Sequence, residues 1–205
     1  MSDKNRPHLD ATTADSDRHL VARVRLGDKA AFEQLFQRHY RPVQQLLWRM
    51  LGDPGLADDL AQETFLALYT HPPQLQADDE GLRAWLYRVA LNRGYNALRS
   101  QRRQQEHLPA MCSPEPMIDP ESEAVRAEEH ARVRAALAAL PERQAKLLLL
   151  RQEEGLKYAS IAAILEVAPS SIGTLLVRAE RAFQLAWDHL NSTRPIPATK
   201  GEHQP

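Results

Sequence analysis

The sequence predicts an all-α protein built from two small helical domains, an N-terminal helical bundle and a C-terminal helix-turn-helix domain, joined by a flexible acidic linker. Apolar residues recur every three to four positions over most of the chain between residues 28 and 188, which is the period of amphipathic helices. A stretch rich in proline and acidic residues interrupts that period near the middle of the chain. With 205 residues, 43% of them hydrophobic, the chain can bury a core on each side of the interruption.

Composition narrows the class of protein. The net charge is −1, so any basic surface must be local. Cys112 is the only cysteine, which excludes a disulfide framework or a thiolate zinc cluster and fits a reducing compartment. The chain has no signal-peptide core and no apolar run near the ~18 residues that a membrane span needs. We therefore expect a soluble, cytoplasmic protein without membrane insertion.

The first domain is expected over residues 25–105, after a disordered leader at 1–24 whose polar start has no helical period. Asp28 is a plausible N-cap for apolar positions that continue to Leu51, forming either one core helix or a kinked pair that divides near Pro42. Gly52 then breaks the chain, and Asp53 and Pro54 suit the start of a second helix that runs to about residue 69.

The second helix carries two faces. One face is apolar and packs inward, through Leu60, Phe65 and Leu68. The other face has positions i, i+3, i+4 and i+7 in one stripe: Asp59, Gln62, Glu63 and Leu66. This stripe indicates docking to a partner protein, with an ordinary solvated face as the alternative. A metal or acid-base site is disfavoured, because no histidine joins the carboxylates at i+3 or i+4.

A loop over residues 71–81 leads to a basic helix over 82–105, which holds six arginines and no acidic residue. Its packing face is expected to comprise Leu82, Leu86, Val89, Ala90 and Ala97. Cations neutralise phosphates and flat rings stack on unpaired bases, so this helix is predicted to bind a single DNA strand. The candidate residues are Arg83, Trp85, Tyr87, Arg88, Asn92, Tyr95 and Arg99. The alternative is an amphipathic helix with solvated arginines and core rings.

The linker is expected at 106–127, where four prolines and several acidic residues favour an extended chain. The second domain should then span 128–190, with Pro141 opening one of its helices, and a disordered tail should follow at 191–205.

Within the second domain, the stretch from Tyr158 to Arg181 reads as a helix, a short turn and a helix. Small and aliphatic residues would face each other across the turn: Ile161, Ala162 and Leu165 against Val167, Ile172, Leu176 and Ala179. Ser170 or Ser171 could cap the second helix. Hydroxyls and arginines suited to phosphates and base edges form its outward stripe, so the candidate duplex-binding residues are Ser170, Ser171, Thr174, Arg178 and Arg181. A plain helical hairpin is the alternative.

Six short motifs in this order resemble the extracytoplasmic-function (ECF) group of bacterial RNA polymerase sigma factors in the sigma-70 family. They are Asp59–Phe65 (DLAQETF), Arg83–Ala90 (RAWLYRVA), Leu140–Gln144 (LPERQ), Glu154–Tyr158 (EGLKY), Ile161–Ala162 and Gly173–Thr174. Each motif is weak alone, but their order and spacing together are specific. The resemblance covers residues 28–188.

The resemblance implies a factor that binds core RNA polymerase, directs it to specific promoters and opens the minus-ten element to initiate transcription. Its partners would be the beta-prime clamp and beta flap of the polymerase, promoter DNA and, as an open question, an anti-sigma factor. By position, Asp59, Gln62 and Glu63 lie where the clamp is bound. The loop over 71–81 and the face of Arg88, Asn92 and Tyr95 lie where the non-template strand is held, and the outward stripe of the helix-turn-helix lies where the minus-thirty-five duplex is read.

This chain departs from the family pattern at several positions. It has Leu176 and Val177 where the family usually carries a basic and then a hydroxyl residue near the duplex. Glu166 stands where the turn commonly has glycine, and Arg93 falls on the otherwise apolar side of the basic helix.

Two rival functions remain. A helix-turn-helix regulator would bind duplex DNA without polymerase, usually as a dimer, but would leave the aromatic basic helix unexplained. A helical adaptor would bind protein only. An enzyme is not expected, because no catalytic nucleophile, metal cluster, cofactor motif or phosphate loop is recognisable.

Overall fold

The computed structural model describes residues 16–75, 80–107, 121–153 and 155–192. Every regular element within these ranges is helical, which confirms the all-α prediction. The predicted loop at 71–81, the linker and both termini lie partly outside the described residues.

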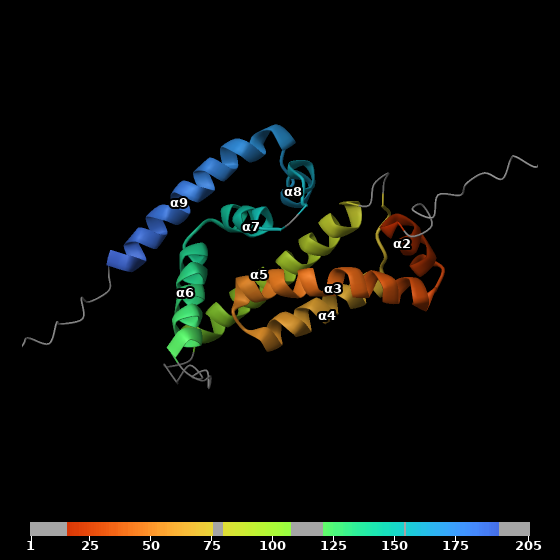
Figure 1. Cartoon of the computed structure of the whole chain (residues 1–205), viewed down its shortest axis with the longest axis horizontal. Coiled ribbons are helices and arrows are strands. Elements are labelled where there is room, and N and C mark those ends of the chain that lie inside the picture. Colours follow the sequence, from red (N-terminus) through yellow and green to blue (C-terminus); the bar gives the residue numbers. More distant parts are fainter. Residues whose placement is uncertain (1–15, 76–79, 108–120, 154, 193–205) are drawn as a thin grey trace, which may run out of the picture.

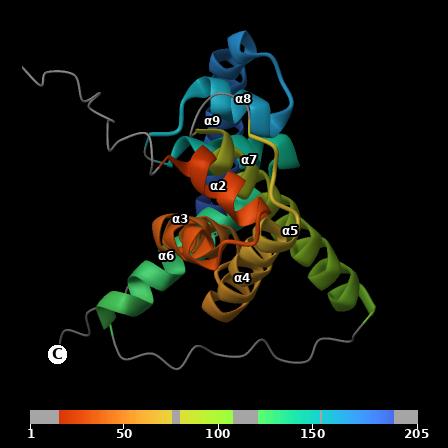
Figure 2. The same cartoon turned by 90° about the vertical axis from the view of Figure 1, so that its right-hand side faces the viewer.

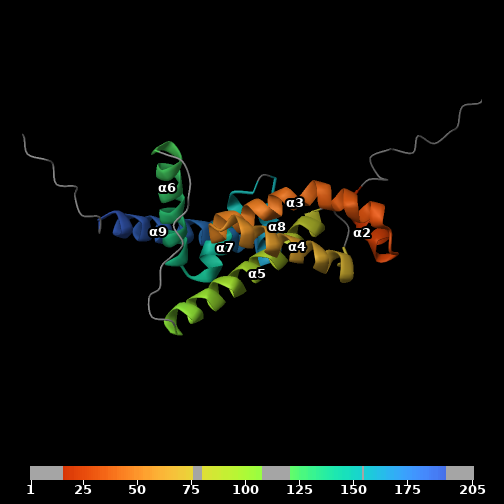
Figure 3. The ribbon, with the colours of Figure 1, turned by 90° about the horizontal axis from the view of Figure 1, so that it is seen from below.

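Four helices form the N-terminal unit (Figure 1): α2 (Asp17–Arg25), α3 (Lys29–Leu51), α4 (Pro54–Thr70) and α5 (Glu80–His107). Helices α3, α4 and α5 run side by side when the molecule is seen from below (Figure 3) and pack against one another. Their facing side chains are fully buried, among them Leu35, Leu46, Leu47, Phe65 and Leu86. Burial of such apolar stripes, more than helix propensity, is what stabilises helices in a protein.

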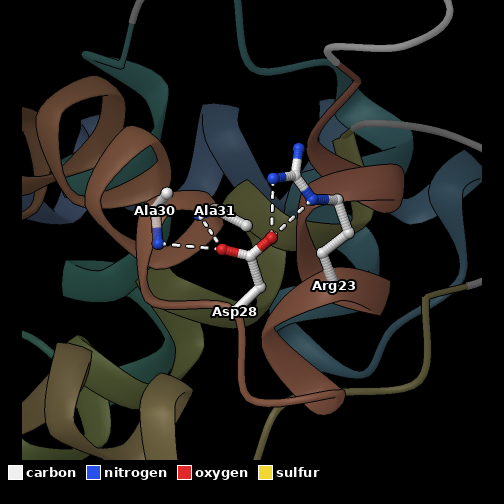
Figure 4. A network of polar contacts seen from close by, with 4 residues as sticks. All are labelled: Arg23, Asp28, Ala30 and Ala31. Atoms are coloured by element: carbon white, nitrogen blue, oxygen red, sulfur yellow. Dashed lines mark hydrogen bonds and ion pairs between the residues drawn. The ribbon is translucent and has the colours of Figure 1, made fainter.

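The turn between α2 and α3 is closed by Asp28 (Figure 4). One carboxylate oxygen accepts hydrogen bonds from the backbone amides of Ala30 and Ala31, at 2.9 and 3.1 Å, so Asp28 is the N-cap of α3. The other oxygen receives two hydrogen bonds from the Arg23 guanidinium, at 2.9 and 2.6 Å. The Arg23 contact and these amides hold the pKa of Asp28 below its usual value. The predicted cap is confirmed, and it also ties α2 to α3.

The region around Pro42 forms one helix, since α3 continues through the proline to Leu51. Of the two alternatives left open by the sequence, the single core helix is therefore correct. Gly52 ends α3 in the left-handed region (φ 74°), a conformation that glycine adopts without steric cost. Asp53 then caps α4 by accepting a hydrogen bond from the Leu56 amide at 3.0 Å, and Pro54 is its first residue.

The C-terminal unit contains the remaining described helices: α6 (Glu121–Ala138), α7 (Glu142–Arg151), α8 (Tyr158–Leu165), the 3₁₀ turn η1 (Pro169–Ser171) and α9 (Ile172–Ser192). Pro141 precedes α7, as expected. The residues predicted to face each other across the helix-turn-helix are buried between α8 and α9, apart from the half-buried Val167: Ile161, Ala162, Leu165, Ile172, Leu176 and Ala179. The helix-turn-helix packing is confirmed.

The turn between α8 and η1 bends at Glu166, whose φ of 55° and ψ of 51° place it in the left-handed region. It is the only non-glycine residue with positive φ in the described part of the chain. This conformation explains why glycine would suit the position.

The two units lie against each other. In the view of Figure 2, α8 and α9 stand above the N-terminal helices, and α5 packs against α8. At the other end of the interface, α3 contacts α6 through Trp48 and His130, whose rings meet edge to face at 5.4 Å between centroids. The buried side chains of both units form one continuous apolar cluster.

Two boundary predictions are corrected. Residues 17–24 were expected in a disordered leader but form most of α2, with Ser16 as its cap and Leu20, Val21 and Val24 buried on α3 and α5. Residues 121–127 were expected in the extended linker but form the start of α6. In both cases the helical period of a short segment was not recognised, because polar or proline-rich residues lie next to it in the sequence.

Candidate polymerase and nucleic-acid interfaces

The predicted docking stripe on α4 is exposed along its whole length. Asp59, Gln62, Glu63 and Leu66 all point to solvent, and the Leu66 side chain is 60% exposed. The opposite side of α4 is buried, with Leu60, Phe65 and Leu68 in the core as expected. An exposed leucine between acidic and amide side chains is a feature of a protein-binding face.

The orientation of α4 is set by a polar network centred on Asp58. Its carboxylate accepts hydrogen bonds from the Tyr40 hydroxyl at 2.8 Å and from Gln44 at 2.6 Å, both on α3. Gln62 donates to the same carboxylate at 2.7 Å, so one member of the stripe is held in place from within α4. Burial, followed by the hydrogen bond to Asp58 and the charge of that carboxylate, raises the pKa of Tyr40 to about 12.

Arg93, whose place on the apolar side of the basic helix was unexplained, reaches Glu63. The two side chains form an ion pair at 2.5 Å between α5 and α4. The arginine therefore does not enter the core; it lies at the edge of the stripe and orients one of its carboxylates.

Sequence reasoning missed an aromatic surface beside the stripe. The rings of Phe32, Phe36 and Tyr40 follow one another along α3, with Phe36 and Tyr40 stacked, and Tyr69 on α4 meets the Phe32 ring edge to face at 5.1 Å. The rings of Phe32, Phe36 and Tyr69, together with Leu66, line an open hollow of about 370 Å³. Its residues come from two helices, so no single helical period could have indicated it.

The predicted DNA-strand face of α5 is only partly accessible. Arg88, Asn92 and Arg99 are exposed, whereas Arg83, Trp85 and Tyr95 are half-buried. Tyr87 is buried at 2% exposure, and its hydroxyl donates a hydrogen bond of 2.7 Å to Glu153 in the loop after α7. Burial, followed by the Glu153 charge, raises the pKa of Tyr87 to about 12. The Tyr87 ring is therefore part of the hydrophobic core in this arrangement.

Side chains of α7 lie over the same face. Lys146 donates a hydrogen bond to the Asn92 side chain at 3.0 Å, and its ammonium lies 5.1 Å from the centre of the Tyr95 ring. Glu142 pairs with Arg99 at 3.3 Å. Burial, followed by the charge of Glu142, raises the pKa of Tyr95. Three predicted strand contacts are thus brought together, and each meets a residue of the C-terminal unit.

The predicted duplex-reading stripe of α9 is open to solvent. Ser170, Thr174, Arg178 and Arg181 are exposed, and Ser171 is half-buried. The two serines belong to η1, which leads directly into α9, and no side-chain cap is formed at the start of that turn. Of the two departures from the family pattern that lie on α9, Val177 is 66% exposed, whereas Leu176 is buried against α8. A basic residue at 176 would therefore not reach duplex from this backbone.

The described residues contain no group of three or more histidine, cysteine or acidic side chains placed to hold a metal ion. They also contain no single helix long and apolar enough to cross a membrane; only α8 together with the segment 169–192 passes such a test, and these are bent by 103°.

Comparison with known proteins gives consistent matches along the chain. Residues 35–104 match the family model of sigma-70 region 2, and residues 130–183 match that of sigma-70 region 4. Together the two models cover more than half of the sequence.

Curated relatives match over most of their length. The chain is 29% identical over 184 residues to the RNA polymerase sigma-H factor of Pseudomonas aeruginosa, covering 85% of this chain and 95% of that protein. It is also 29% identical over 177 residues to the ECF RNA polymerase sigma-E factor of Escherichia coli K12, covering 82% and 92%.

Two solved structures share the fold. CnrH in complex with the cytosolic domain of CnrY aligns with a TM-score of 0.60 at 24% identity, covering 87% of this chain and 99% of that one. The sigma factor RpoE of Bartonella quintana in complex with the anti-sigma factor NepR aligns with a TM-score of 0.53 at 19% identity, covering 80% and 98%.

Proposed function

As a member of the ECF group of the sigma-70 family, this chain is an RNA polymerase sigma factor, and we propose that it contacts core enzyme through α4 and promoter DNA through α5 and α9. The observation that supports this proposal is that the three helices present different kinds of side chain. The exposed face of α4 is acidic with one leucine, that of α5 is basic with the half-buried rings of Trp85 and Tyr95 beside it, and that of α9 combines hydroxyls with arginines.

The α4 stripe suits protein rather than DNA. Asp59 and Glu63 would repel phosphates, and Leu66 offers an apolar contact beside them. The chemistry favours a basic partner surface with an apolar element, and the beta-prime clamp of the polymerase is the proposed occupant. The aromatic hollow next to Leu66 would extend the same contact.

The α5 face suits an unpaired DNA strand, because arginines alternate with flat rings along it. Arg88 and Arg99 can neutralise phosphates, and Tyr95 can stack on a base once Lys146 leaves it. This face would hold the non-template strand of the minus-ten element during promoter opening.

The α9 stripe suits duplex DNA, because the second helix of a helix-turn-helix presents its first residues to the major groove. Thr174 and Arg178 lie two turns or less from the start of α9 and are exposed. They are the proposed readers of the minus-thirty-five element, and Arg181 is placed for backbone phosphate.

The remaining partners follow from the family. The C-terminal unit would meet the beta flap of core enzyme, and the chain would act in the cytoplasm as an initiation factor, with the polymerisation chemistry left to the polymerase. Both structural neighbours were solved as complexes with another protein, one of them named as an anti-sigma factor, and an anti-sigma partner is proposed for this chain too.

Run-off transcription tests the proposal. Purified core polymerase should start transcripts at a discrete set of promoters in a genomic DNA library only when this chain is added. Core enzyme alone supplies the baseline, and core with an unrelated sigma factor supplies the control for promoter choice. Unchanged start sites on addition of the chain, together with dimeric duplex binding in the absence of polymerase, would favour the regulator instead.

A further inference from the structure

We propose that the cavity at the junction of α3, α6, α7 and α9 is a binding site for small aromatic anions, in which arginines hold the acidic group and an apolar wall holds the ring. Helix α3 packs against α6 and α7 there, and α9 packs against the same two helices. The cavity has a volume of about 550 Å³, which suits a small organic molecule. It shares no lining residue with the proposed interfaces on α4, α5 and α9, so it adds a ligand that promoter recognition does not require.

The apolar wall comes from both units of the protein. Trp48, near the end of α3, is 37% exposed and meets the His130 ring of α6 edge to face. Phe183 on α9 is half-buried and stacks on Trp187, at 6.1 Å between ring centroids. The aliphatic lining residues are Val133, Leu137, Leu148 and Leu149. A flat apolar ring that enters this space is removed from water, which favours its binding.

Basic side chains outnumber acidic ones in the lining. Arg49, Arg134 and Arg151 line the cavity, and Glu180 is the only acidic residue that joins them. Glu180 is exposed on α9 and pairs with none of the basic side chains within the described residues. The excess of positive charge therefore favours an anionic ligand over a neutral one.

Arg134 is the cation with the least compensation. It is half-buried on α6, and its side chain has no ion pair or hydrogen bond within the part of the chain that the structure describes. The guanidinium lies so close to Gly52, at the end of α3, that a side chain at position 52 would collide with it. Burial holds the pKa of Arg134 below its usual value. Since a cation in apolar surroundings is costly without a counter-ion, the acidic group of a ligand would supply the missing partner.

Arg49 offers a second unused donor. Its terminal nitrogen pairs with Glu153, but its Nε is buried and has no hydrogen-bond partner among the described residues. The planar guanidinium group matches the oxygens of carboxylate, sulfonate and phosphate groups. Two such groups beside an apolar wall should therefore select a ring that carries an acidic group over a neutral ring.

The test compares two fluorescent probes on the full chain, without DNA or polymerase. Anilinonaphthalene sulfonate carries an acidic group on an aromatic body, and phenylnaphthylamine has the same aromatic body without the acidic group. The original chain should bind the sulfonate at one site, with an affinity about tenfold or more above that for the neutral probe, because only the sulfonate can pair with the guanidinium groups.

Three charge variants separate the arginine contact from apolar binding. Arg134→Gln should lower the affinity for the sulfonate about tenfold and leave the affinity for the neutral probe unchanged. Glu180→Gln removes the one nearby negative charge, so it should raise the affinity for the sulfonate about two- to threefold. Arg25→Gln makes the same charge change as Arg134→Gln at an exposed position of α2, and it should alter neither affinity.

The place of binding is read from the three tryptophans by nuclear magnetic resonance of their indole N–H groups. Trp48 lines the proposed site, so its signal should shift as the sulfonate is added. Trp85 lines a different cavity, beside α8, and its signal should stay in place.

Urea unfolding of each variant checks that it is folded. If Arg134→Gln does not fold, Arg151→Gln replaces it, because Arg151 is exposed and lines the same cavity. Equal affinities for the two probes, an unchanged sulfonate affinity in the charge variants, or a shift of Trp85 in place of Trp48 would each overturn the proposal. The cavity would then be an apolar surface for a protein partner. Because neither promoter nor polymerase is present, the result is independent of the outcome of run-off transcription.

Discussion

Leu176 offers a sharp test of how the helix-turn-helix is built. It stands where relatives were expected to carry a basic residue near DNA, yet its side chain is 5% exposed and packs between α9 and α8. Its neighbour Val177 is 66% exposed. The same substitution should therefore destabilise the protein strongly at Leu176 and hardly at all at Val177.

The magnitude follows from burial. Truncating a buried leucine to alanine costs about 2–5 kcal/mol, because transfer free energy is lost and a cavity remains. Leu176 lies in a thin layer between two helices that can partly collapse, so we expect about 2–3 kcal/mol for Leu176→Ala. Leu176→Lys should cost at least as much, because the ammonium must reach water past α8. Val177→Ala and Val177→Lys should stay within about 0.5 kcal/mol of the original chain.

Urea unfolding followed by circular dichroism measures these differences. Both Leu176 variants should lower the unfolding midpoint, and both Val177 variants should leave it nearly unchanged. An unchanged midpoint for Leu176→Lys would show that this side chain points outward, and the assignment of the duplex-reading stripe would fail with it.

Three further predictions concern single side chains. Tyr95→Ala should cost about 1–3 kcal/mol of strand binding in the complex with polymerase, seen as reduced permanganate reactivity of promoter thymines, and full reactivity would count against stacking. Arg178→Ala should weaken the upstream footprint, by about 1–3 kcal/mol if it contacts a base in bidentate geometry, whereas an unaltered footprint would make it a bystander. Burial raises the pKa of Asp17, but hydrogen bonds and charges from His39 and Arg38 outweigh this and leave it below 3.8. Stabilisation by Asp17 is then present above its unfolded pKa and lost as the pH falls through the folded one, so the urea midpoints of the original chain and Asp17→Asn should converge as the pH falls below about 5; a constant gap would refute the assignment.

Local patterns made most of the fold predictable. Asp28 and Asp53 precede apolar periods and act as caps, and the apolar faces of α4, α8 and α9 are buried as their spacing indicates. Helix α2 carried the same kind of signal, with Ser16 before Leu20, but nine residues beside a polar leader were too short for the period to stand out.

Long-range pairings were not predictable. Arg49 and Glu153 are 104 positions apart, and neither belongs to a motif that names the other. Arg93 looked misplaced because its partner Glu63 lies on another helix. The strand-binding residues of α5 remain a prediction, and the structure adds that Tyr95 and Asn92 are engaged by Lys146.

Docking to polymerase separates a sigma factor from other DNA-binding proteins, so affinity for core enzyme is the most direct measurement. Fluorescence titration of the labelled chain with core polymerase should show saturable binding. Truncating Asp59, Gln62 and Glu63 together to alanine leaves the buried side of α4 intact. If these side chains contribute about 2 kcal/mol or more to binding, the affinity for core enzyme should fall more than about tenfold. Undiminished affinity in the triple variant, or no binding of the original chain to core enzyme, would contradict the account.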